Sequence, residues 1–207
     1  MNLSSSLVLG GLLLFTLQSG PVPVPKAVQS IPAPTSGDTR TPITSLPTTI
    51  TECGSYVLAR CLTGEVGSHG IEILADDVTL DLNGFTLQGV PGSLSGIRIG
   101  DHSGFEIQGG TLRDWGEDGI DAELADQAMF HDLRLRGNGR AGLRAGARSS
   151  VRNCISRGNG DFGIYAADTQ VRVRDCTSSG DGHSAVTDAG GIVATSDSMV
   201  LHNSVDN

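Results

Sequence analysis

Residues 130–166 read FHDLRLRGNGRAGLRAGARSSVRNCISRGNGDFGIYA, and this stretch decides the fold because it contains one pattern twice. The motif Arg-Gly-Asn-Gly stands at 136–139 and again at 157–160, and a related Ser-Gly-Asp-Gly stands at 179–182. A repeat length in the low twenties is typical of a solenoid, in which each turn buries its apolar face against the next turn.

A glycine followed by a branched apolar residue extends this repeat along the chain. The doublets are Gly70-Ile71, Gly96-Ile97, Gly119-Ile120, Gly142-Leu143, Gly163-Ile164 and Gly191-Ile192, with steps of 26, 23, 23, 21 and 28 residues. After each doublet apolar and polar residues alternate, which is the pattern of a strand with one buried face. Because equivalent strands must stack coil on coil, we predict an all-β, single-stranded parallel β-helix of about 5–6 coils over residues 68–207.

Alignment of the repeats predicts which residues stack. The expected interior column is Phe130, Val151, Val173 and Leu201. The expected bend column is Asp132, Asn153, Asp175 and Asn203, because Asn and Asp tolerate left-handed backbone. Cys154 and Cys176 share a further column and are expected to point inward as small apolar residues.

The chain before residue 68 has three expected parts. The apolar run from Leu7 to Leu17 has the length of a secretory signal core and is too short to span a bilayer, so residues 1–20 are interpreted as a signal peptide. Residues 21–47 are rich in proline and are expected to form an extended linker. Residues 48–67 are expected to form a cap over the first coil. The predicted location is therefore extracellular, either secreted or on the cell surface.

Charge and aromatic content bear on the possible ligands of the protein, and the spacing of two cysteines bears on a possible disulfide. The net charge of −9 and an aromatic content of 4% argue against a nucleic-acid-binding protein. The charge is uneven, because residues 130–207 hold nine arginines against eight acids. Cys53 and Cys61 are eight residues apart, and a disulfide between them requires the chain to turn back on itself.

Three segments indicate a family. SLP at 45–47, GSYVL at 54–58 and GIEILADDVTLDLNG at 70–84 resemble secreted bacterial right-handed parallel β-helix proteins of the pectin-lyase-like superfamily. The resemblance covers about residues 43–207 and implies a right-handed helix. Members include polysaccharide lyases, hydrolases and epimerases as well as repeat proteins, so shared fold does not carry an activity across. The polygalacturonase motifs and the Tyr-Gly-Phe-Asp-Pro-His motif of mannuronan epimerases do not occur in this sequence.

One outward-facing column holds the candidate catalytic residues. It runs Glu72, Arg98, Asp121, Arg144, Tyr165, and Glu123 is expected beside it between two glycines with no side-chain neighbours. Asp121 and Glu123 would act on a sugar chain while Arg144 or Arg98 neutralises the carboxylate of a uronate, with Arg98 and Tyr165 binding substrate. The alternative is a ladder of ion pairs, because the charges along the column alternate in sign. Trp115 is the other candidate for an exposed, sugar-binding aromatic residue.

Two further sets of residues have ligand-binding chemistry. The column His131, Arg152, Arg174, His202 is basic and would hold an acidic polysaccharide, the alternative being a solvated face. The carboxylates of Asp114, Glu117, Asp118, Asp121 and Glu123 are oxygen donors for calcium, although the sequence has no calcium-binding repeat.

The sequence supports a protein that contacts extracellular polysaccharide, with catalysis left open. The alternatives are a non-catalytic structural repeat protein and a polysaccharide lyase or glycoside hydrolase. We also expect the chain to continue past Asn207, or its open edge to pair with another molecule, because an uncovered coil presents unpaired strand edges.

Overall fold

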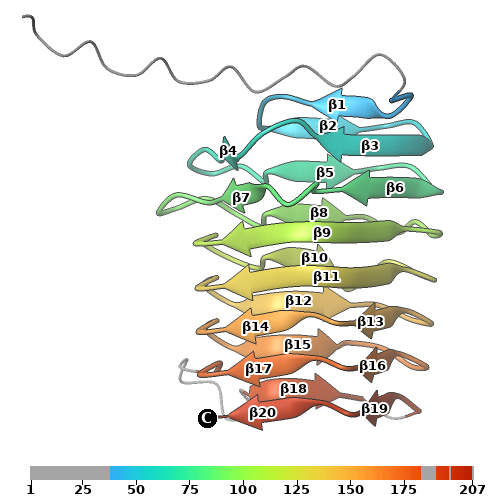
Figure 1. Ribbon diagram of the computed structural model, residues 1–207, viewed down its shortest axis with the longest axis vertical. Coiled ribbons are helices and arrows are strands. Elements are labelled where there is room, and N and C mark those ends of the chain that lie inside the picture. The colour runs from blue at the N-terminus through green and yellow to red at the C-terminus, as the bar shows by residue number, and fades with distance from the viewer. Residues whose placement is uncertain (1–37, 183–189, 196, 207) are drawn as a thin grey trace, which may run out of the picture. The chain divides into compact units, whose positions relative to one another are not determined.

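The computed structural model describes residues 38–182, 190–195 and 197–206 and shows a parallel β-solenoid over Thr41–Asp206 (Figure 1). The signal peptide and most of the linker predicted from the sequence lie outside the described residues. All pairings between named strands are parallel, and each strand pairs with its equivalents in the neighbouring coils. The all-β solenoid predicted from the glycine doublets is confirmed.

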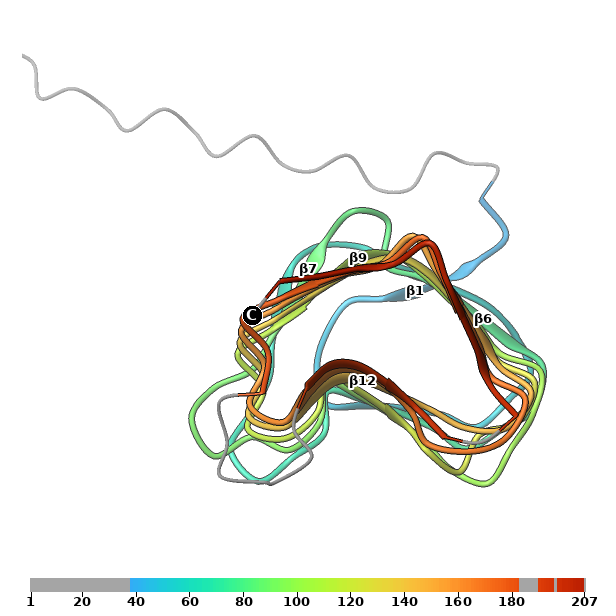
Figure 2. The same cartoon turned by 90° about the horizontal axis from the view of Figure 1, so that it is seen from below.

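One side of the solenoid is a seven-stranded sheet. Its strands, in spatial order, are β2 (Thr48–Ile50), β5 (Ile71–Ile73), β8 (Ile97–Ile99), β10 (Ile120–Ala122), β12 (Ala141–Ala145), β15 (Phe162–Ala166) and β18 (Gly190–Ala194). Each predicted doublet from Gly70 to Gly191 leads into or lies in one of these strands. In Figure 2 the ribbon of this sheet bows toward the interior of the solenoid.

The remaining strands form a 13-stranded sheet with two flanks. The first flank contains β1 (Thr41–Ile43), β3 (Gly54–Leu58), β6 (Val78–Asp81), β13 (Ser150–Arg152), β16 (Arg172–Arg174) and β19 (Met199–Leu201). The second flank contains β4 (Leu62–Thr63), β7 (Thr86–Gln88), β14 (Ile155–Arg157), β17 (Thr177–Ser179) and β20 (Ser204–Asp206). Two long strands, β9 (Glu106–Arg113) and β11 (Met129–Arg136), run through both flanks.

The corner between the flanks is made by the predicted bend column. Asp132, Asn153 and Asp175 have φ angles of 57°, 52° and 54°, the left-handed conformation that Asn and Asp tolerate. In the last coil this position is taken by His202 (φ 51°) and not by Asn203, so the sequence alignment was wrong there by one residue.

The same shift moves the interior column in the last coil. Val173 pairs with Val200, and the predicted Leu201 pairs with Arg174 instead. The reason is a shorter connection: Ile164 and Val173 are nine residues apart, whereas the matching Ile192 and Val200 are eight apart. Side-chain stacking sets the register, and the loop absorbs the difference in length.

There are about seven coils, one more than the doublets predicted, because the first coil lacks the doublet. Thr48 of β2 pairs with Ile71, a spacing of 23 residues that fits the repeat. Residues 48–67, expected to form a cap, contain β2, β3 and β4, and each of these strands pairs in parallel with the next coil. The end of the expected linker is likewise packed, because β1 pairs with β3.

The core is a narrow apolar column between the sheets. Its first-flank layer stacks Leu80, Ile107, Phe130, Val151 and Val173, all fully buried. Cys154 and Cys176 point inward, as predicted. Trp115, expected as an exposed sugar-binding residue, is only 1% exposed, and its indole N–H donates to the carbonyl of Leu87 at 3.2 Å. Gly70 leaves room for it, since a Cβ there would lie 2.7 Å from the indole ring.

A buried polar ladder runs through the turns that connect the second flank to the seven-stranded sheet. Asn138, Asn159 and Asp181, which the Arg-Gly-Asn-Gly alignment placed in one column, are 2%, 0% and 8% exposed. The side-chain amide of Asn138 donates to Asn159 Oδ1 at 2.9 Å, and the side-chain amide of Asn159 donates to Asp181 Oδ1 at 2.8 Å. Stacking of these two amides and one carboxylate satisfies polar groups that burial would otherwise leave without partners.

Candidate functional site

The outer face of the seven-stranded sheet carries the predicted column of candidate catalytic residues. Register pairs Glu72 with Arg98, Arg98 with Asp121, Asp121 with Arg144, and Arg144 with Tyr165. The side chains alternate with the buried isoleucines and leucine of the same strands, so they face outward. The sequence therefore placed all five residues of this column correctly in space.

The charges of this column form only part of the expected ladder of ion pairs. Arg98 Nη1 lies 4.0 Å from Glu72 Oε1, a long and solvent-exposed contact. Arg144 pairs with Glu123, at 2.7 Å between Nη2 and Oε2, and not with its register neighbour Asp121. Within the described part of the chain, Asp121 forms no ion pair.

Glu123 is not the isolated carboxylate that the flanking glycines suggested. It lies in the turn just after β10, beyond the last residue of the regular strand, and from there its side chain reaches Arg144. The prediction that Glu123 has no side-chain neighbour is wrong. It assumed that Glu123 continues the register of β10 and is therefore flanked by the glycines at the equivalent positions of the neighbouring coils, whereas the strand ends at Ala122.

Arg144 is held between a carboxylate and an aromatic ring. Its guanidinium carbon is 5.5 Å from the centre of the Tyr165 ring, and its side chain is 16% exposed. Tyr165 in turn stacks on Phe162, with ring centres 4.8 Å apart and planes at 19°. The result is an Arg144–Tyr165–Phe162 stack, which a single sequence column could not reveal because Phe162 lies three residues before Tyr165.

Asp118 is a buried carboxylate close to this face. Its Oδ1 accepts the backbone N–H of Ala141 at 2.8 Å, whereas Oδ2 has no hydrogen-bond partner and lies 3.7 Å from Arg140 Nη1. Burial raises the pKa of Asp118 from its ordinary 3.8 to about 6, although the Ala141 N–H and Arg140 act in the opposite direction. Loss of hydration therefore outweighs the nearby positive charge.

The raised pKa of Asp118 predicts a pH-dependent stability. The unfolded chain ionises this carboxyl near pH 3.8 and the folded chain only near pH 6, so stability falls as the pH rises through this window. Asp118→Asn should remove the loss, so its stability relative to the parent should rise between pH 4 and pH 7 by up to about 3 kcal/mol. Urea unfolding across this pH range measures it. Asp118→Ala should flatten the same dependence while also losing the Ala141 bond; parallel pH profiles for all three proteins would contradict the prediction.

The five carboxylates considered for calcium do not converge. Among the residues that the structure describes, no group of three His, Cys, Asp or Glu side chains is placed to hold a metal ion. Asp114 pairs with Arg113 at 2.9 Å on the second flank, and Glu117 accepts the Ser95 hydroxyl at 3.4 Å. Glu123 pairs with Arg144, and Asp118 Oδ1 accepts the backbone N–H of Ala141.

The predicted basic column lies on the first flank, with His131, Arg152 and Arg174 in register. His202 is displaced from it by the one-residue shift, and Leu201 takes its position. His131 is only 5% exposed, and its ring nitrogens contact Glu106 at 2.9 Å and Asp132 at 2.7 Å. The hydrogen bond from His131 lowers the pKa of Asp132. Arg152 and Arg174 remain accessible, whereas His131 is already enclosed by two carboxylates.

The second flank carries a row of arginines that was not among the residues predicted to form a site. Arg113, Arg136 and Arg157 are in register at the ends of β9, β11 and β14. The signal was present in the sequence, because Arg136 and Arg157 open the two Arg-Gly-Asn-Gly motifs. The first residue of each motif is the last residue of its strand and is exposed, so both arginines face outward.

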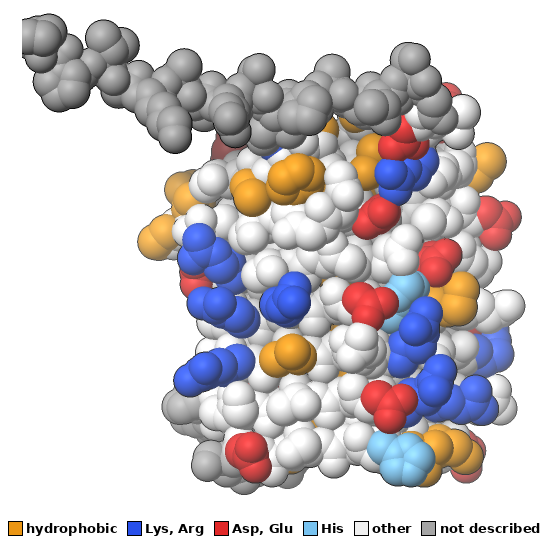
Figure 3. All heavy atoms as spheres, in the orientation of Figure 1, with side chains coloured by type: hydrophobic (Ala, Val, Ile, Leu, Met, Phe, Trp, Pro, Cys, Tyr) orange, Lys and Arg blue, Asp and Glu red, His pale blue; other side chains and the backbone are white. Residues whose placement is uncertain are grey.

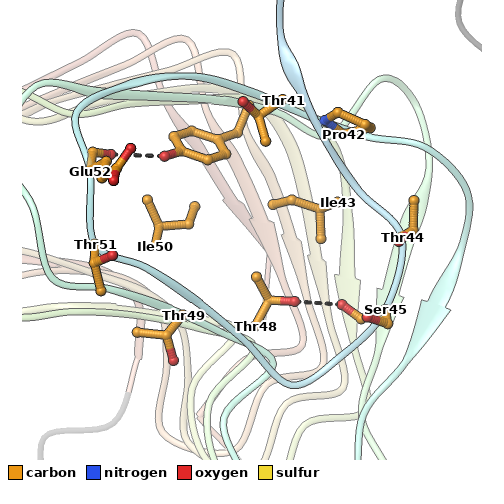
Figure 4. Close-up of a pocket in the computed structure, with 11 residues that line it drawn as sticks. Thr41, Pro42, Ile43, Thr44, Ser45, Thr48, Thr49, Ile50, Thr51 and Glu52 are labelled. Carbon is orange, nitrogen blue, oxygen red and sulfur yellow. Dashed lines mark hydrogen bonds between the residues drawn. The ribbon is translucent and has the colours of Figure 1, made fainter.

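Two hollows lie near the N-terminal end of the solenoid. The larger, of about 340 Å³, is bordered by β1, β2 and Tyr56, and five of its eleven lining residues are threonines (Figure 4). The Tyr56 hydroxyl, at the border of this hollow, donates to the carbonyl of Glu52 at 2.9 Å. The smaller, of about 230 Å³, lies where the seven-stranded sheet meets the loop with His69, and Glu72 lines it. His69 Nδ1 accepts the Ser95 N–H at 3.2 Å, so the ring is fixed by the backbone.

The cysteine pairs differ in their surroundings. Cys53 and Cys61 are exposed and free, so the disulfide considered from the sequence is not formed. Cys154 and Cys176 are stacked neighbours, and the contact with Cys176 together with burial raises the pKa of the Cys154 thiol.

Comparison with known proteins supports the fold. No curated protein and no solved structure shows significant similarity to this chain. Among the described residues, no helix has the length and apolar character needed to cross a bilayer. The family sequence model described as "right handed beta helix region" matches residues 50–207, which is most of the chain and the whole span from β3 to β20. The chain belongs to the right-handed β-helix family.

Proposed function

We propose that this β-helix is a secreted or cell-surface protein that contacts extracellular polysaccharide through the outer face of its seven-stranded sheet, without cleaving it. The observation that carries the proposal is the Arg144–Tyr165–Phe162 stack. Both rings are partly exposed, and Tyr165 lies in the same column as the charged side chains of Arg98 and Asp121. Sites that combine an aromatic surface with a few fixed polar groups suit sugars, which have apolar ring faces and hydroxyl edges.

The ion pairs favour binding over a lyase reaction. A lyase acting on a uronate needs a cation to neutralise the substrate carboxylate, but Arg144 already pairs with Glu123 at 2.7 Å. Glu123 is correspondingly unavailable as a base unless this pair separates. Among the described residues Asp121 forms no ion pair, although its Oδ1 accepts the Glu123 backbone N–H at 3.5 Å, and glycosidases use two facing carboxyl groups.

Secretion and membership of the pectin-lyase-like superfamily are parts of the proposal that rest on the sequence. Detection of the protein outside the cell, with a mature N-terminus near residue 20, would support the signal-peptide interpretation. Edge-to-edge association through the last coil also remains a prediction, and gel filtration of the 207-residue chain tests it.

The proposal predicts that Tyr165→Ala weakens glycan binding. The test titrates the full chain with a panel of neutral and acidic polysaccharides. For the polysaccharide that the parent binds, loss of the Tyr165 ring should weaken the affinity by about three- to tenfold. Tyr165→Phe keeps the aromatic face and should bind like the parent. No ultraviolet-absorbing unsaturated product should accumulate in any mixture.

Three outcomes would contradict the proposal. If the parent binds no member of the panel, the structural repeat protein is the better interpretation. Equal binding by Tyr165→Ala and the parent would exclude this face as the contact surface. Unsaturated product that disappears in Asp121→Asn would establish the lyase alternative.

A further inference from the structure

Four arginines gather on the outer face of the second flank. Arg113 pairs in register with Arg136, and Arg136 with Arg157, across three successive coils. Arg134 lies two residues before Arg136 on the same outward face of β11. In Figure 3 the blue side chains on this side of the molecule form two groups, and one follows the ends of β9, β11 and β14. We call the set Arg113, Arg134, Arg136 and Arg157 the arginine ladder.

Most of the arginine ladder has no compensating charge. Arg113 pairs with Asp114 at 2.9 Å and donates to the Gln88 side-chain carbonyl at 2.8 Å. Within residues 38–182, 190–195 and 197–206, no ion pair involves Arg134, Arg136 or Arg157. All three are exposed. Their guanidinium groups are therefore free to meet a ligand.

This arrangement is unfavourable without a ligand. Adjacent strands are about 4.8 Å apart, and like charges directly opposite each other across strands are destabilising. On the seven-stranded sheet the same chain avoids the problem, because Glu72, Arg98, Asp121 and Arg144 alternate in sign from coil to coil. The arginine ladder places Arg136 directly against Arg157, in a protein whose net charge is −9.

We propose that the arginine ladder binds a linear acidic polysaccharide lying along the solenoid axis, with its carboxylate or sulfate groups on Arg134, Arg136 and Arg157. Stacking at one arginine per coil offers a regular row of charges to a polymer with regularly spaced anions. The planar guanidinium group donates two parallel hydrogen bonds to a carboxylate or sulfate. Arginine is also what the chain uses throughout, since Lys26 is its single lysine.

The neighbouring residues favour a polysaccharide over other polyanions. Polar residues without charge occupy several further outward positions of this flank, and their hydroxyl and amide groups can hydrogen-bond to sugars: Thr86, Thr111, Thr177, Gln88 and Ser179. Single-stranded nucleic acid is normally bound by aromatic side chains that stack on its bases, and the strands of this flank carry none among the described residues. A protein surface that binds an anionic membrane normally inserts several apolar residues into it. Beside the arginine ladder, Ile155 is the one exposed large apolar side chain among the described residues of β14 and of the second-flank parts of β9 and β11.

This inference goes beyond the proposed function, because it concerns another face and does not depend on Tyr165. The test is binding of the full chain to polygalacturonate, dextran sulfate and neutral dextran at low salt. We expect binding to at least one of the two acidic polymers, none to neutral dextran, and weakening by added salt. The double variant Arg136→Gln, Arg157→Gln should lose at least about tenfold in affinity, because two charge-assisted contacts are removed.

A matched control separates this surface from net charge. Arg60→Gln with Arg148→Gln removes the same two charges from outside the flank and should bind like the parent. Thermal unfolding should show that Arg136→Gln, Arg157→Gln is at least as stable as the parent, since a like-charge contact is relieved.

Four results would overturn the inference. The first is absence of binding to both acidic polymers, and the second is equal weakening of binding by both double variants. The third is weaker binding by Tyr165→Ala but not by Arg136→Gln, Arg157→Gln. The fourth is arginine-dependent binding of an oligonucleotide, or of anionic phospholipid vesicles, that is as tight as binding of the polysaccharide. The third result would leave the proposed function standing on the seven-stranded sheet.

Discussion

Val151→Asp is expected to unfold the solenoid. Val151 is fully buried in β13, and its register partners are Phe130 in the coil before and Val173 in the coil after, both also fully buried. A carboxylate at this position would have no partner among the apolar side chains around it. An unpaired buried charge costs about 3–5 kcal/mol, a large part of the stability of an ordinary domain. Urea unfolding followed by circular dichroism measures the loss.

The control for this prediction lies on the neighbouring strand. Arg172→Asp introduces the same side chain at an exposed position of β16, one residue before the buried Val173, and should change stability by less than about 1 kcal/mol. If Val151→Asp and Arg172→Asp melted alike, residue 151 would not face the interior, and the stacking register would be wrong.

Asn159→Ala is expected to have the second largest effect, because Asn159 is the centre of the buried polar ladder. Its Oδ1 accepts the backbone and side-chain N–H groups of Asn138 at 3.0 and 2.9 Å. Its own side-chain amide donates to Ser156 Oγ and Asp181 Oδ1, each at 2.8 Å. Alanine would leave several of these groups without partners and without water. Each such group costs about 1–3 kcal/mol, so we expect a loss of about 3 kcal/mol or more.

Asn153→Gly is the matched control for Asn159→Ala in the buried polar ladder. Asn153 belongs to the same coil but lies at the exposed corner with φ 52°, a conformation that glycine adopts readily. Its loss removes one exposed hydrogen bond to Asp132 and should cost less than about 1 kcal/mol. Chemical unfolding of both variants decides the matter, and equally small losses would mean that the ladder contributes little to stability.

The sequence predicted registers well and loop lengths poorly. The column Val151 and Val173 follows from the repeat itself, because identical turns must stack. Leu201 was misplaced because the connection before β19 is one residue shorter than the one before β16. The coil containing β2 was missed because Pro47 and Thr48 stand where the glycine doublet would be, although the spacing of 23 residues from Thr48 to Ile71 is kept.

The candidate site shows the same division. Strand register placed Asp121, Arg144 and Tyr165 in one column, as predicted. The partner of Arg144 could not be predicted, because Glu123 lies in a turn whose side-chain direction depends on the local backbone. The enclosure of His131 by Glu106 and Asp132 likewise depends on rotamers and on side chains from two coils.

The sequence by itself therefore determined the architecture. Its repeat of glycine, apolar and Asn or Asp residues specifies parallel coils, because each turn can bury its apolar face only against an equivalent turn. Only the tertiary structure decided which outward charges are neutralised. Arg144 and Arg136 are both outward-facing strand residues, yet Arg144 is held by Glu123 and Tyr165, whereas Arg136 stacks between Arg113 and Arg157. The physical reason is that a charge is compensated by whatever lies within a few ångströms in space, and turns and neighbouring coils set those distances.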